Sequence, residues 1–108
     1  MNNTEKIPLT EAVFYILLSL FSPMHGYGIM QNAKELSNGR VNLGPGTLYG
    51  AINTLLEKNW IMSFEGEKDS RKKEYVITEL GKSIVQGELL RLEELLANGK
   101  KVIGGDTK

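Results

Sequence analysis

The hydrophobic pattern of this chain changes from a helical to an extended period and back again, and these changes restrict the folds that the chain can adopt. Up to about Asn59, apolar residues recur at helical spacing in three short stretches. Between Ile61 and Ile77, two extended stretches enclose a polar turn around residues 68–70 and predict a β-hairpin. A further helical stretch follows residue 78. Three helices, a hairpin and a last helix are the element order of a winged helix-turn-helix, in which the hairpin is the wing.

The predicted fold class is therefore mostly α with a small β-hairpin, and capping and turn residues limit its elements. Thr10 and Thr78 are the expected N-caps of the first and last helices. Helices are predicted over residues 11–22, from the turn at 25–28 to about 37, from the Gly44–Pro45–Gly46 turn to about 59, and over 79–98, with strands over 61–67 and 72–77. The predicted division is a flexible tail over 1–8, a winged helix-turn-helix domain over 9–78, a C-terminal dimerisation helix over 79–98, and a flexible tail over 99–108.

The composition argues against several classes of function. The chain has 108 residues, no cysteine and one histidine, His25, so it offers neither a zinc–thiolate site nor a His-dependent catalytic triad. We therefore expect no enzyme, no metal and no cofactor. The start does not resemble a signal peptide and the apolar stretch 12–21 is too short to span a bilayer, so a cytoplasmic protein is expected. The 13 basic and 13 acidic residues cancel, so any contact with DNA must come from local clusters.

The third predicted helix carries the most specific functional signal. Its apolar residues form one buried stripe, and the opposite face presents small and polar residues, namely Thr47, Tyr49, Gly50 and Asn53. Threonine and asparagine can hydrogen-bond base edges, and tyrosine can contact a phosphate or a sugar. Gly50 costs an exposed helix about 1 kcal/mol relative to alanine, which close approach to a DNA backbone would explain. The alternative is that these residues are only the solvated face of an amphipathic helix.

The turn of the predicted hairpin is the densest basic segment of the chain. Its cations are Lys68, Arg71, Lys72 and Lys73. Such a cluster at the tip of a hairpin can contact phosphates or enter a minor groove. The alternative is solubilising charge on a two-stranded ribbon, because nearby glutamates dilute the positive field.

The last helix predicts a partner subunit. Its apolar residues from Val85 to Leu96 follow one another at the spacing of a coiled-coil seam, with Glu88 and Arg91 among the charged residues beside it. The predicted dimerisation residues are Phe14 and Leu18 of the first helix and Val85, Leu89, Leu92 and Leu96 of the last. A symmetric dimer would place two reading helices about one DNA turn apart on a palindromic site. The alternative is that the last helix packs only on its own domain.

Five segments of the chain combine into a recognisable pattern. They are His25–Gly26–Tyr27–Gly28–Ile29, Gly46–Thr47–Leu48–Tyr49, Leu55–Leu56–Glu57 with Trp60–Ile61, Arg71–Lys72–Lys73–Glu74–Tyr75, and Thr78–Glu79–Leu80–Gly81. Together they resemble the PadR family of transcriptional regulators, from about Leu9 to Leu96. The resemblance implies a winged-helix domain, a dimerisation helix and repression of a nearby operon. It also implies release from the operator by a small phenolic or lipophilic effector.

The resemblance further implies which residues face DNA. Carried over by position, these are Thr47, Tyr49, Gly50 and the Arg71–Lys73 wing, with Tyr27 on the DNA side of the supporting helix. Trp60 departs from the family pattern, which usually has a small or aliphatic residue there; it is either a core anchor or a platform for a ligand. The expected function is a DNA-binding regulator, a repressor that binds a palindromic operator as a homodimer. The alternative is a winged-helix module that binds protein and not DNA, which the net neutrality favours.

Overall fold

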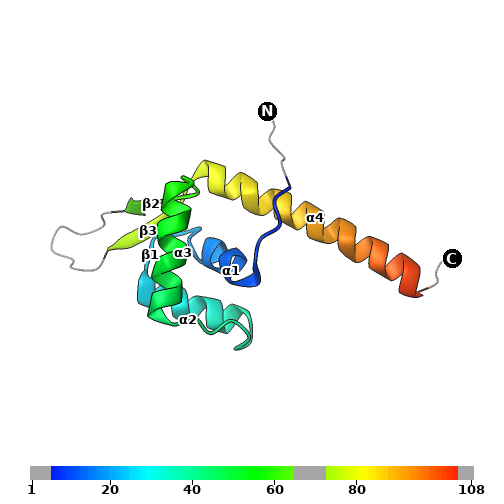
Figure 1. The fold of residues 1–108 in the computed structure, drawn as a ribbon, viewed down its shortest axis with the longest axis horizontal. Helices are drawn as coiled ribbons and strands as arrows, with labels where there is room; N and C mark the ends of the chain where they lie inside the picture. The colour runs from blue at the N-terminus through cyan, green and yellow to red at the C-terminus, as the bar shows by residue number, and fades with distance from the viewer. Residues whose placement is uncertain (1–5, 65–72, 105–108) are drawn as a thin grey trace.

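The computed structural model describes residues 6–64 and 73–104, and it has the predicted winged-helix architecture (Figure 1). The elements in chain order are α1 (Glu11–Ser19), β1 (Met24–His25), α2 (Gly26–Leu36), α3 (Pro45–Glu57), β2 (Ile61–Phe64), β3 (Glu74–Ile77) and α4 (Glu79–Gly104). The four helices and the β2–β3 pair confirm the mostly α fold class.

The sheet has three strands, one more than the predicted hairpin. Its order is β1-β3-β2, all antiparallel, with His25 opposite Glu74 and Ile61 opposite Ile77. The extra strand, β1, is two residues long, so it has no alternation that a sequence pattern could reveal. Because β1 leads directly into α2, the sheet of the wing is joined to the start of the helix-turn-helix.

Side-chain caps and one strand contact set the helix limits. Thr10 accepts a hydrogen bond from the Val13 N–H at 3.1 Å, as expected for the N-cap of α1. This helix ends at Ser19, earlier than the predicted 22, because the Leu20 carbonyl accepts the Ile77 N–H of β3 at 2.8 Å. The second helix starts at Gly26, within the predicted turn, since His25 Nδ1 accepts the Gly28 N–H at 3.2 Å.

One hydrophobic core joins α1, α2, α3, the sheet and the first turns of α4. Its buried residues are Ile16, Leu17, Leu20, Ile29, Leu48, Ile52, Leu55, Trp60, Ile61, Tyr75, Ile77, Ile84 and Val85. Trp60 is therefore a core residue rather than an open platform. Gly81 lies against the Trp60 carbonyl so closely that any side chain there would overlap it, and the Thr78 hydroxyl caps the same corner by accepting the Gly81 N–H at 3.0 Å.

The last helix packs on the domain only over its first turns and then projects away from it (Figure 1). Its final buried residues are Gly87 and Glu88, and almost every residue from Leu89 onward is exposed. The helix continues to Gly104, beyond the predicted end at residue 98. The chain therefore carries a compact head and a long exposed helical arm, with α1 between α2 and that arm.

Candidate nucleic-acid interface

The first turn of α3 leaves its N-terminus accessible. Gly44 is the N-cap residue, Pro45 occupies the first turn, and no side chain caps this end of the helix. Proline is suited to this position because it has no N–H to satisfy and its φ is already helical. The free N–H groups and the positive end of the helix dipole are thus available to a phosphate.

The face of α3 opposite the core is open to solvent. The core side is formed by Leu48, Ile52 and Leu55, which are almost fully buried. The structure places on the exposed face all four residues that the sequence predicted there: Thr47, Tyr49, Gly50 and Asn53. Thr47, Tyr49 and Asn53 thus supply exposed polar groups on one face, which can hydrogen-bond to base edges or the DNA backbone.

Gly50 has no structural reason to be glycine. A Cβ atom added there would meet no other atom within 4 Å, and its φ lies in the ordinary helical region. Alanine would therefore fit and would favour the helix by about 0.5–1 kcal/mol. The open space at Gly50 leaves room for a close approach to this face of α3.

Two tyrosines lie where α3 meets the start of α2. The Tyr49 ring and hydroxyl contact Gly26 so closely that any side chain at Gly26 would overlap them. Tyr27, the next residue, is 62% exposed, and its hydroxyl accepts a hydrogen bond from Gln31 Nε2 at 3.1 Å. Tyr49 thus fixes the two helices together while 44% of its surface stays exposed.

A third tyrosine, Tyr75 of β3, supports this junction from the core. Burial raises the pKa of the Tyr75 hydroxyl above 10.0, and its electrostatic interaction with Tyr49 adds a smaller rise. Tyr75 is therefore neutral at physiological pH. Tyr75 lies in the hydrophobic core at 6% exposure.

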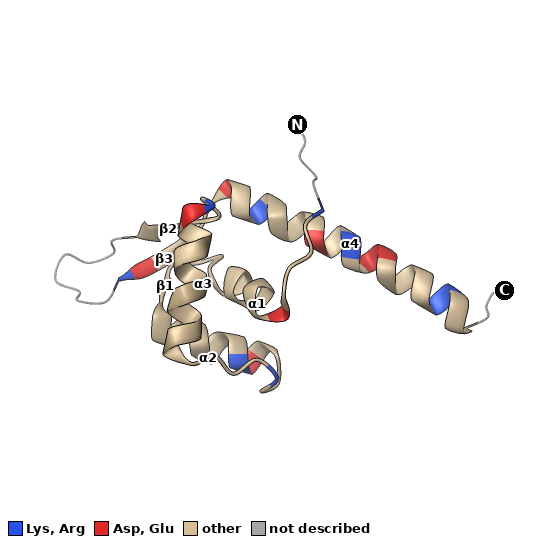
Figure 2. Cartoon of the chain, in the orientation of Figure 1, with Lys and Arg blue, Asp and Glu red and all other residues tan. Residues whose placement is uncertain are grey.

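The exposed face of α3 carries almost no charge (Figure 2). The only charged residue of α3 is Glu57, at its C-terminal end. Of the predicted wing cations, Lys73 is exposed just before β3, whereas Lys68, Arg71 and Lys72 lie outside the described residues. Attraction to phosphates must therefore come from outside α3.

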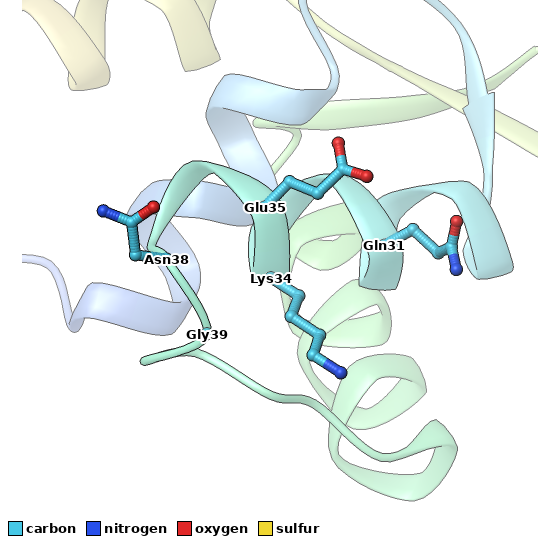
Figure 3. Close-up of a pocket in the computed structure, with 5 residues that line it drawn as sticks. All are labelled: Gln31, Lys34, Glu35, Asn38 and Gly39. Atoms are coloured by element: carbon cyan, nitrogen blue, oxygen red, sulfur yellow. The ribbon is translucent and has the colours of Figure 1, made fainter.

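A shallow hollow of about 480 Å³ lies at the C-terminal end of α2 (Figure 3). It is lined by Gln31, Lys34, Glu35, Asn38 and Gly39, and the labelled side chains point in different directions instead of converging on one point. Within residues 6–64 and 73–104, no group of three or more acidic, histidine or cysteine residues is placed to hold a metal ion. No helix in this same part of the chain is long and apolar enough to cross a membrane.

The predicted dimerisation residues fall into two groups. Leu89, Leu92 and Leu96 are 47%, 39% and 59% exposed on the projecting part of α4. Val85 belongs to the core at 2% exposure, so it has little surface left for a partner and the available stripe starts at Leu89. Phe14 and Leu18 are partly buried against the core of their own domain.

Sequence reasoning missed two features of α4. Val102 and Ile103 are 80% and 87% exposed and extend its apolar surface past the predicted helix end. Glu88, expected among the charged residues beside the seam, is 2% exposed and is hydrogen-bonded to Arg91 and to Leu9. In a helical pattern a glutamate is expected on the surface. The only sequence signal for the burial of Glu88 is Arg91 three residues later, which can pair with it.

These features define a winged helix-turn-helix transcriptional regulator. Residues 14–86 match the family described as "Transcriptional regulator PadR-like family". The chain belongs to this family, which confirms the resemblance found in its sequence, and the family comprises transcriptional regulators rather than enzymes.

Solved structures agree with this assignment. The chain is similar to a transcriptional regulator from Clostridium thermocellum, with 27% identity, 90% of this chain and 92% of that one covered, and a TM-score of 0.63. It is also similar to a PadR family regulator from Eggerthella lenta, with 20% identity, 87% and 82% covered, and a TM-score of 0.69.

One further relative is much longer. An uncharacterised 37.1 kDa protein of transposon TN4556 from Streptomyces fradiae is 33% identical over 66 residues. The match covers 61% of this chain but only 18% of that protein's length.

Proposed function

We propose that this protein is a repressor that binds a palindromic operator as a homodimer. The observation that carries the proposal is the open face of α3, where a Cβ atom added at Gly50 would meet nothing within 4 Å beyond the local backbone, and where Thr47, Tyr49 and Asn53 are exposed. This face enters the major groove, and Thr47 and Asn53 contact base edges there. Tyr49 and the α3 N-terminus contact the adjacent phosphates.

The wing supplies the sequence-independent part of the affinity. Its cations Lys68, Arg71, Lys72 and Lys73 contact phosphates. Tyr27, which is 62% exposed at the start of α2, is the remaining DNA-facing residue of this proposal. Because α3 holds no cation, the counterion release on binding comes from other parts of the head, and the wing is its most densely basic segment.

Two copies of α4 form the dimer contact. Leu89, Leu92 and Leu96 meet the same residues of a second copy, and the partly buried Phe14 and Leu18 cover the edge of this contact. A small phenolic or lipophilic effector bound against this apolar surface would change the distance between the reading heads and so release the operator.

Footprinting on DNA upstream of the chain's own gene tests the proposal directly. We expect a protected palindrome, with binding that falls steeply as salt rises. Asn53→Ala should reduce the preference for the operator over unrelated DNA, whereas Glu93→Gln, an exposed change on α4, should leave it unaltered. Absence of salt-dependent binding to any upstream segment would reject the repressor function.

A module that binds protein is the second candidate, and the cation-free face of α3 favours it. In that case Asn53→Ala would weaken capture of a protein partner and leave DNA binding undetectable. The salt titration therefore separates the two candidates, because a neutral protein contact lacks the counterion slope.

A further inference from the structure

The N-terminal segment is attached to α4 by the most deeply buried charged side chain in the described residues. Glu88 accepts the Leu9 N–H at 3.2 Å through Oε2. It also accepts Arg91 Nε at 2.7 Å and Arg91 Nη2 at 2.9 Å, one on each carboxylate oxygen. This bidentate geometry restricts the orientation of both side chains more than a single hydrogen bond would.

The contact between Leu9 and Glu88 joins the start of α1 to α4. Leu9 directly precedes Thr10, the N-cap of α1, so the bond from Leu9 to Glu88 holds the start of α1 against α4. Lys6 adds a weaker contact along the same path, 3.5 Å from Glu94. Figure 1 shows the N-terminal segment running across to α4 where this helix leaves the head.

Glu88 is the last residue of α4 that is buried in the head. Beyond it the helix continues to Gly104, about 24 Å at a rise of about 1.5 Å per residue. The hydrogen bonds of Glu88 therefore lie where the projecting part of α4 leaves the head. A rotation of about 10° there would move Lys101 by about 3 Å, given the same helical rise.

Burying a carboxylate removes it from water, and a buried ion pair often contributes less to stability than apolar residues of similar volume. Arg91 keeps part of its side chain in solvent, 25% exposed, whereas the Glu88 side chain is 3% exposed. Such a pair can be retained for the geometry that it fixes.

We infer that Glu88 and Arg91 are positioning residues that set the angle between the reading head and the α4 arm. The inference rests on the proposed function, because this angle then decides which spacing of operator half-sites the dimer accepts. Adding one base pair rotates one half-site by about 34°, so a dimer with a fixed angle must reject it.

A distance measurement within one protomer tests the angle without DNA. The chain has no cysteine, so spin labels attach only at Glu57→Cys on α3 and Lys101→Cys on α4, both exposed positions. Labelled chains are diluted with an excess of unlabelled chains, which restricts the measured distances to one protomer. We expect one narrow distance distribution in the otherwise unchanged protein.

Two variants and one control decide the result. Glu88→Gln and the double variant Glu88→Met/Arg91→Leu should broaden the distribution, or shift its mean, by about 3 Å, the swing expected from the helical rise. Glu93→Gln, an exposed change on the same helix, should leave it unaltered. The double variant is included because apolar replacement of a buried pair commonly retains the fold.

A folded double variant that keeps the narrow distance distribution would overturn the inference. Loss of folding in both variants would also overturn it, because the pair would then be needed only for the fold. Binding to operators with half-sites moved by one or two base pairs completes the test. The discrimination between spacings should fall at least about threefold in the variants, since their heads can rotate onto unfavourable sites. If no chain binds DNA, the proposed function fails while the distance result still decides the positioning role.

Discussion

Replacing Gly50 with alanine should change stability and DNA affinity in opposite directions. The added methyl group meets no atom within 4 Å in the folded chain, so the helix gains about 0.5–1 kcal/mol in free energy of unfolding. For a chain of this size, that gain corresponds to a rise in Tm of about 4 °C. Thermal unfolding followed by circular dichroism measures this part.

The same methyl group should weaken operator binding. If α3 lies in the groove, the methyl displaces the helix and loses about one hydrogen bond per reading head, about 1 kcal/mol each. Two heads in the dimer then give about 2 kcal/mol, close to a thirtyfold loss of affinity. Fluorescence anisotropy with labelled operator DNA measures this part.

Gly99→Ala is the matched control for the Gly50 variant. Gly99 also lies within a helix, and a Cβ there also meets nothing within 4 Å, but α4 is remote from the reading face. We expect Gly99→Ala to raise the free energy of unfolding about as much as Gly50→Ala does. The affinity of the dimer for the operator should stay unchanged. If Gly50→Ala is more stable and binds the operator as well as before, the face of α3 does not approach DNA closely and the reasoning is refuted.

Three further predictions concern the wing, the arm and the buried carboxylate. Alanine at all three positions of Arg71–Lys73 should lower the slope of log affinity against log salt by up to about 5 per dimer, measured by anisotropy; an unaltered slope would place the wing away from phosphates. Glutamate at Leu89 and Leu92 should yield monomers in sedimentation velocity, because both side chains are exposed on the projecting arm, and a persistent dimer would contradict the seam. The hydrogen bonds from Arg91 lower the pKa of Glu88 below 4.5, so its contribution to stability is present above about pH 4.5 and is lost as pH falls through the folded-state value. Urea unfolding should therefore show the advantage over Glu88→Gln shrinking below about pH 4.5, and a pH-independent difference would contradict this assignment.

Most of the head could be predicted because its signals are local. The periodicity of α3 separates Leu48 and Ile52 from the exposed face. In the structure both residues are buried on the core side of the helix. The caps at Thr10 and Thr78 needed only knowledge of which side chains can accept a nearby N–H.

The features that sequence reasoning missed depend on contacts between distant segments. The strand β1 exists because Met24 and His25 meet β3, some fifty residues away in the chain, which no local pattern records. Val85 fits a coiled-coil seam by spacing alone, but α1 and the sheet cover it first. Glu88 is buried because Leu9 and Arg91 supply three hydrogen bonds, and only a three-dimensional arrangement shows that these donors converge.

The absence of cations on α3 changes how the parts of this protein depend on one another. A reading helix without cations gains specificity from its base contacts but little sequence-independent affinity, so a single head should bind weakly. Joining two heads makes the second contact intramolecular, and the gain in affinity depends on whether both can engage at once. The angle held at Glu88 therefore matters more here than it would for a strongly basic head. An error in that angle loses the bivalent contact, and α3 offers no surplus charge to compensate for the loss.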